Sequence, residues 1–119
     1  MTRKVLIIDD EVDLVSLMEQ RLSHFYKVIT ANDGESGLKK VMEEKPDLII
    51  TDINMPNMNG YQLIQKIKSN LATAKIPILL LTVESHTNAI YKAQEMGATD
   101  YVIKPINFEE LPAIVQRYI

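Results

Sequence analysis

The sequence lacks cysteine and contains only four glycines among its 119 residues. Without cysteine the chain forms neither a disulfide nor a zinc–thiolate or iron–sulfur site. No GxxxxGK[ST] or GxGxxG pattern occurs, so the glycine-rich loops that hold the phosphates of nucleotides and dinucleotides are missing. These absences count against a nucleotide or flavin binder and against any thiol-ligated metal site.

Long hydrophobic runs are also missing. The longest wholly apolar runs, such as residues 5–8 and 78–81, last four residues, whereas a membrane-spanning helix needs about 20. The apolar stretch near the start ends at Asp9, too early for a signal peptide. We therefore expect no membrane partner and a cytoplasmic location.

Basic residues are not in excess, since 13 Lys and Arg stand against 16 Asp and Glu, for a formal net charge of −3. A domain that grips the phosphates of nucleic acid usually carries a basic face, so we expect no direct nucleic-acid contact. The length suits one domain, and the 46% hydrophobic and 24% charged residues are ordinary for a globular chain. We expect residues 1–119 to form that domain.

Short apolar segments alternate with segments of helical period. Strands are expected at residues 4–9, 27–31, 48–51, 78–82 and 100–104. Five helices are expected from apolar residues at helical spacing, which are Leu14, Val15, Met18, Leu22 and Phe25; Leu38, Val41 and Met42; Leu63, Ile64, Ile67 and Leu71; Ala89, Ile90, Ala93 and Met96; and Leu111, Val115 and Tyr118. Pro46 ends the second helix, because the residue before a proline avoids helical geometry, and Gly97 caps the fourth.

Five strands, each followed by a helix, predict a parallel sheet with helices on both faces. The strands at 4–9, 48–51 and 78–82 are nearly unbroken apolar runs, typical of central strands, whereas the other two contain polar residues and suit the edges. This pattern favours an α/β, flavodoxin-like fold: a three-layer, doubly wound sandwich with a five-stranded sheet in the order 2-1-3-4-5 and five helices.

Polar side chains stand where these strands end. In such a sheet, ligands bind beyond the carboxyl ends of the strands. The residues expected at this rim are Asp9, Asp10, Asp52, Thr82 and Lys104, and Glu11 follows the acidic pair. Any one of them is explained as a solvated strand end, and Asp9 alone as a helix cap. The presence of such polar residues at the ends of four different strands instead indicates a functional site.

Three carboxylates and one ammonium carry a formal charge of −2. Crowded carboxylates either raise a pKa or recruit a cation, and a ligand set made only of oxygens selects a hard ion such as Mg²⁺, with Mn²⁺ as the alternative. A carboxylate in such a site is able to attack phosphorus and form an aspartyl-phosphate. The metal and Lys104 would then stabilise charge on the phosphoryl oxygens.

In these features the chain resembles the receiver domain of two-component response regulators. In size it is similar to the single-domain chemotaxis type. The matching residues are Asp9-Asp10, the segment 52–56 (DINMP), Gly60, Thr82 and the segment 100–105 (DYVIKP). The resemblance implies that Asp52 accepts a phosphoryl group from a phospho-histidine donor. It also implies that Asp10, Asp52 and the backbone carbonyl of Asn54 bind Mg²⁺, with Asp9 acting mainly through water.

The resemblance further implies a conformational switch. Lys104, followed by a cis-linked Pro105, would contact the phosphoryl oxygens. Thr82 would move toward the phosphoryl group and Tyr101 would turn inward, changing the face formed by the fourth helix, fifth strand and fifth helix. The alternative interpretation of Tyr101 is that its ring simply packs at the edge of the sheet and has no role in a switch. The implied partners are a histidine kinase or phosphotransfer protein, and an output protein or a fused output domain.

Asn54, Val83 and Glu84 occupy positions that tune phosphoryl lifetime in the family. The family usually has Ala or Gly at the position of Val83, so we hypothesise slower reaction with small phosphodonors or slower hydrolysis. Asn54 and Glu84 are instead of the types found in short-lived chemotaxis receivers. Pro112 removes an N–H from the last helix, which is therefore expected to start late or kink.

Two other functions compete with the switch. A metal-dependent phosphohydrolase commonly has a second carboxylate two residues after its nucleophile, and Asn54 at that position cannot protonate a leaving group. A receiver-like interaction module that is never phosphorylated is the other alternative. Apart from its own phosphorylation and dephosphorylation at Asp52, the chain is not expected to be an enzyme. It is either free-standing or the receiver portion of a longer regulator.

Overall fold

The computed structural model describes residues 2–83 and 87–119. Its sheet has five parallel strands in the order β2-β1-β3-β4-β5, which confirms the predicted order. The strands are β1 (Lys4–Ile8), β2 (Lys27–Ala31), β3 (Leu48–Asp52), β4 (Ile78–Thr82) and β5 (Asp100–Ile103). The boundaries differ from the predicted ones by a single residue, at the ends of β1, β3 and β5.

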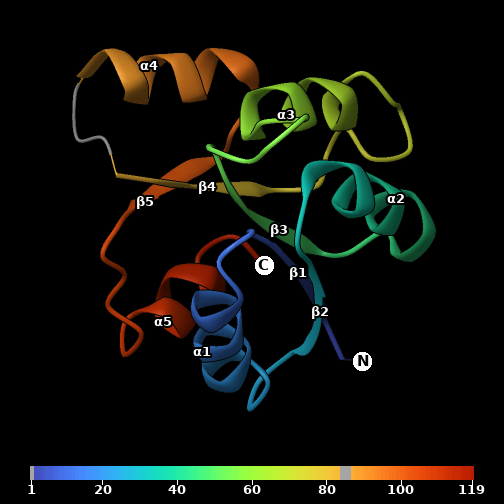
Figure 1. Cartoon of the computed structure of the whole chain (residues 1–119). Coiled ribbons are helices and arrows are strands. Elements are labelled where there is room, and N and C mark those ends of the chain that lie inside the picture. The colour runs from blue at the N-terminus through green and yellow to red at the C-terminus, as the bar shows by residue number, and fades with distance from the viewer. Residues whose placement is uncertain (1, 84–86) are drawn as a thin grey trace.

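Helices cover both faces of the sheet (Figure 1). They are α1 (Val12–Leu22), α2 (Gly34–Glu44), α3 (Gly60–Lys68), α4 (Thr87–Met96) and α5 (Leu111–Gln116). α1 and α5 pack on one face and α2, α3 and α4 on the other, so the fold is the predicted three-layer α/β sandwich. Among the described residues, no helix is long and apolar enough to cross a membrane.

The central strands are buried on both faces, which explains their unbroken apolar sequences. In β1, Leu6 and Ile8 belong to the core under α2, α3 and α4, whereas Val5 and Ile7 belong to the core under α1 and α5. All four side chains are inaccessible to solvent. The outer strands β2 and β5 are partly exposed, as predicted for edges.

Helix ends follow the local signals in the sequence. α2 ends at Glu44, and Lys45 adopts a left-handed conformation (φ 45°) directly before Pro46. α4 ends at Met96, and Gly97 follows with φ +106°. The late start expected for the last helix is confirmed, because α5 begins at Leu111 and Pro112 lies in its first turn, where a missing N–H costs little.

Two residues predicted to lie on buried helical stripes are exposed. α1 ends at Leu22, and Phe25 lies beyond it with 64% of its surface exposed, while Tyr26 packs on the core instead. Leu71 lies beyond α3 and is 96% exposed. There the side chain of Asn70 accepts the backbone N–H of Ala72 at 2.9 Å, which forms a turn in place of another helical turn.

The last residues of the chain also leave the predicted helix. Tyr118 lies beyond α5, yet it packs against the core shared by α1 and α5. Its hydroxyl donates to Oδ2 of Asp100, at the start of β5. The prediction that Tyr118 belongs to the last helix was therefore wrong.

Candidate functional site

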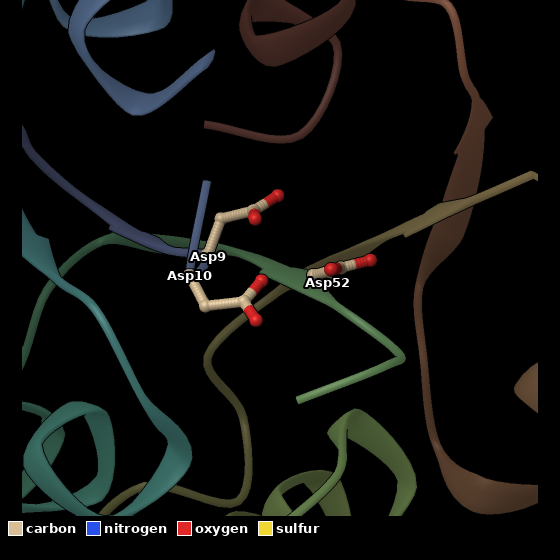
Figure 2. A group of neighbouring side chains, drawn as sticks. All are labelled: Asp9, Asp10 and Asp52. Atoms are coloured by element: carbon tan, nitrogen blue, oxygen red, sulfur yellow. The ribbon is translucent and has the colours of Figure 1, made fainter. Parts of the chain in front are cut away.

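Three aspartates meet at the carboxyl ends of β1 and β3 (Figure 2). Asp9 and Asp10 follow β1, and Asp52 is the last residue of β3. One carboxylate oxygen from each lies within 4.8 Å of the other two. Asp9 is fully buried and Asp52 is 6% exposed, whereas Asp10 is exposed. The predicted acidic cluster therefore forms.

Strand register brings the two buried aspartates together. β1 and β3 are parallel neighbours in which Ile8 pairs with Thr51, so the next residues, Asp9 and Asp52, leave the sheet side by side. Oδ1 of Asp9 accepts the backbone N–H of Glu11 at 2.9 Å, and Oδ1 of Asp52 accepts that of Ile53 at 2.9 Å. These hydrogen bonds fix the orientation of both carboxylates.

Lys104, the residue directly after β5, joins this cluster. Its Nζ lies 3.2 Å from Oδ2 of Asp9 and 3.4 Å from Oδ1 of Asp52, and its side chain is only 12% exposed. Its backbone N–H donates to the carbonyl oxygen of Thr82 at 2.7 Å. The Lys104–Pro105 peptide bond is cis, as the resemblance implied.

The surroundings of the buried carboxylates oppose their ionisation. Burial raises the pKa of Asp9, and the negative charge of Asp52 raises it further. Burial likewise raises the pKa of Asp52, with a further contribution from Asp10. Lys104 offsets only part of both effects. For Lys104 itself, burial lowers the pKa, but the charges of Asp9 and Asp52 and the hydrogen bonds to Asp9 and Glu11 together outweigh burial and raise the pKa.

This combination fits a hard divalent cation. The ligand atoms of the cluster are carboxylate oxygens, and the single ammonium leaves a formal charge of −2 on the three aspartates and Lys104. A positive ion would remove the remaining repulsion. Oxygen ligands at an open rim suit Mg²⁺, which keeps several of its waters.

The remaining predicted residues lie around the same rim. Thr82 ends β4 and is 5% exposed. Tyr101 pairs with Leu80, two residues before Thr82, so its partly buried ring belongs to the same face of the sheet as Thr82. Val83 is 66% exposed and Asn54 is exposed in the turn after β3. Glu84 lies outside the described residues.

Sequence reasoning gave Glu11 no role at the site. Its Oε1 lies 3.2 Å from Nζ of Lys104, and the Glu11 side chain is 62% exposed. The only signal in the sequence was its place directly after the acidic pair. That place does not reveal a contact with a residue 93 positions away.

Comparisons with known proteins point to one family. The family profile "Response regulator receiver domain" matches residues 5–116. The chain is 38% identical to the alkaline phosphatase synthesis transcriptional regulatory protein PhoP of Bacillus subtilis, over the whole of this chain and 49% of PhoP. It is 40% identical to hybrid signal transduction histidine kinase D of Dictyostelium discoideum, over 93% of this chain and 7% of that kinase. The chain thus spans about half, or less, of these curated relatives.

Solved structures agree with this family. The chemotaxis response regulator CheY4 of Vibrio cholerae superimposes with a TM-score of 0.94 at 32% identity, over all of both chains. The BeF3-activated receiver domain of DrrB superimposes with a TM-score of 0.90 at 31% identity, over 99% of this chain and 97% of that one. The chain belongs to the receiver domain family of two-component response regulators.

Proposed function

We propose that this chain is a phosphorylation-activated signalling switch of a two-component phosphorelay, and that Asp52 is its phosphoryl acceptor. The observation that carries the proposal is the position of Asp52, which has a carboxylate oxygen within 4.8 Å of oxygens of two further aspartates and lies 3.4 Å from the Lys104 ammonium. Oδ1 of Asp52 is occupied by the N–H of Ile53 and faces Lys104. We therefore assign Oδ2 as the nucleophile.

The proposed reaction is phosphoryl transfer from a phospho-histidine donor. Oδ2 of Asp52 forms a bond to phosphorus as the bond between phosphorus and the imidazole nitrogen breaks. The electron pair of that bond stays on the imidazole, which takes a proton from solvent. The Lys104 ammonium lies where it would attract the oxygens of the transferred group. Water attack on phosphorus later restores the Asp52 carboxylate.

Mg²⁺ is the proposed cofactor, and Mn²⁺ fits the same oxygens. Asp10, Asp52 and the backbone carbonyl of Asn54 would hold the ion, with Asp9 acting mainly through water. The bound ion supplies positive charge that offsets the negative charge of a phosphoryl group. The crowding of three carboxylate oxygens within 4.8 Å supports this assignment.

Thr82 and Tyr101 are the proposed relay. They belong to one face of neighbouring strands, and a movement of Thr82 toward phospho-Asp52 would leave space for Tyr101 to turn inward. Phosphorylation would thereby bias a two-state equilibrium and alter the surface formed by α4, β5 and α5. That surface would bind the output partner.

We further propose that residues 1–119 form one receiver domain and that a histidine kinase or phosphotransfer protein is the donor. The names of two relatives, a hybrid histidine kinase and a transcriptional regulatory protein, support a place between a kinase and an output protein or fused output domain. On this account the chain acts chemically only on its own Asp52.

Intact mass spectrometry after incubation with acetyl phosphate tests the proposal. Wild type should gain the mass of one phosphoryl group when Mg²⁺ is present and none with a chelator, and Asp52→Asn should gain nothing. Asp13→Asn is the matched control, because it removes an exposed carboxylate nearby in α1, and it should label like wild type. If neither wild type nor Val83→Ala labels, the chain is an unphosphorylated interaction module instead.

A further inference from the structure

We propose that Glu11 is a positioning residue that holds the Lys104 ammonium before phosphorylation and competes with the phosphoryl group for it. The inference rests on the proposed function of Asp52. The Nζ of Lys104 is as close to Oε1 of Glu11 as to Oδ2 of Asp9, at 3.2 Å, and is farther from Asp52, at 3.4 Å. Glu11 therefore contacts the ammonium as closely as Asp9 does and more closely than Asp52 does.

The location of Glu11 is fixed by the site itself. It is the N-cap residue of α1, and its backbone N–H donates to Oδ1 of Asp9 at 2.9 Å. The Glu11 side chain lies with Lys104 at an apolar groove that Leu14, Val83 and other residues also line. Its carboxylate thus stands at the outer edge of the acidic cluster, on the solvent side of the ammonium.

The three carboxylates around Lys104 are not equally able to release it. An ammonium has three donors, and here it is surrounded by three carboxylates. Asp9 is fully buried and Asp52 is the acceptor, whereas the side chain of Glu11 is 62% exposed. Glu11 alone regains full hydration by turning into solvent, so its contact is the one that yields when the phosphoryl oxygens need the ammonium.

Glu11 also adds negative charge to the site. The four carboxylates and one ammonium carry a formal charge of −3, and this charge opposes the approach of an anionic phosphoryl group. The competition for Lys104 and this charge repulsion both weaken the binding of a phosphoryl group. Removing the Glu11 charge should strengthen binding of a phosphoryl group or its analogue, by about two- to fivefold for an exposed ion pair.

Calorimetric titration of the full chain with beryllofluoride in the presence of Mg²⁺ measures this directly. Glu11→Gln keeps the length of the side chain and removes its charge, and it should bind beryllofluoride about two- to fivefold more tightly than wild type. Asp13→Asn is the matched control, since it removes an exposed carboxylate two residues further along. It should bind like wild type, because Glu11 contacts the Lys104 ammonium and no contact of Asp13 with Lys104 is found among the described residues.

A double-mutant cycle separates positioning from general stabilisation. In the Lys104→Met background, Glu11→Gln should strengthen binding less than it does beside Lys104, because only the charge repulsion is left to remove. An undiminished gain without Lys104, an equal gain in Asp13→Asn, or no gain in Glu11→Gln would overturn the inference alone. If wild type binds no beryllofluoride, the proposed function of Asp52 is overturned with it. If Lys104→Met binds beryllofluoride too weakly to titrate, the affinities of Glu11→Gln and Asp13→Asn, compared with wild type, still test the inference.

Discussion

Gly60 packs directly against the backbone of Asp52. A Cβ added at Gly60 would lie 2.3 Å from the carbonyl oxygen of Asp52 and 2.9 Å from Cα of Ile53. The N–H of Gly60 also donates to the carbonyl oxygen of Ile53 at 2.7 Å. The start of α3 therefore fixes the backbone that carries the acceptor, and only a residue without a side chain allows this approach.

Gly60→Ala should consequently destabilise the fold. The backbone atoms that the methyl group meets cannot move without displacing Asp52, so we expect a loss of about 1–3 kcal/mol in the free energy of unfolding. Urea denaturation measures this loss.

Gly37→Ala is the control for this substitution. The three atoms nearest to its added Cβ all belong to the Ile8 side chain, the closest being Cδ1 at 2.7 Å. The methyl group would therefore press on side-chain atoms rather than on the backbone of Asp52, and alanine favours the helix over glycine by about 1 kcal/mol. A loss in Gly37→Ala as large as that in Gly60→Ala would contradict the account of the close approach.

Removal of a carboxylate that we propose as a metal ligand should weaken Mg²⁺ binding. Asp10 is exposed but contributes one of the three clustered oxygens. We expect Asp10→Asn to lower Mg²⁺ affinity by about tenfold or more, since even the loss of a group that only supports a metal ligand costs that much. Calorimetry with MgCl₂ checks this. Asp13→Asn should bind Mg²⁺ like wild type, and a similar loss there would mean that overall charge is responsible.

The raised pKa values of Asp9 and Asp52 predict a pH dependence in the absence of metal. Because burial and neighbouring carboxylates raise these pKa values above the unfolded value, the folded state binds protons more tightly. Its stabilisation is complete below about pH 4, the unfolded pKa, and is lost as pH rises through the folded pKa. In a chelator, wild type should therefore lose stability relative to Asp52→Asn as the pH rises above about 4. A difference in unfolding free energy that stays constant with pH would count against this.

Val83 is expected to slow the chemistry of Asp52. It directly follows Thr82 at the rim, is 66% exposed and carries a branched side chain. Val83→Ala should accelerate labelling by acetyl phosphate and hydrolysis of the phosphorylated form, as followed by intact mass over time. Val12→Ala trims a similarly exposed valine at the start of α1 and is the control. If both rates are unchanged in Val83→Ala, the hypothesis is wrong.

The fold was predictable because its main signals are local. Unbroken apolar runs identify β1, β3 and β4, since these strands are buried on both faces. Pro46 and Gly97 stop helices through their own backbone geometry. The positions of Phe25 and Leu71 depended instead on where the chain turns, and an apolar residue one helical turn beyond a real helix continues the same periodicity.

The site was predictable to the extent that strand ends define it. Asp9 and Asp52 are adjacent because β1 and β3 are adjacent, and topology alone implies that. The contact of Glu11 with Lys104 depends on side-chain rotamers across two strand ends, for which the sequence contains no periodic signal. The raised pKa values likewise follow from burial, which only the packed structure reveals.

Chemical identification of the phosphorylated residue tests the central claim most directly. Borohydride reduces an aspartyl-phosphate to homoserine, so peptide sequencing after treatment with acetyl phosphate, Mg²⁺ and then borohydride locates the acceptor. The account predicts homoserine at position 52 in the treated protein and unchanged aspartate there when the phosphodonor is left out. Homoserine at position 9 or 10, or aspartate retained at position 52 in fully labelled protein, would contradict it.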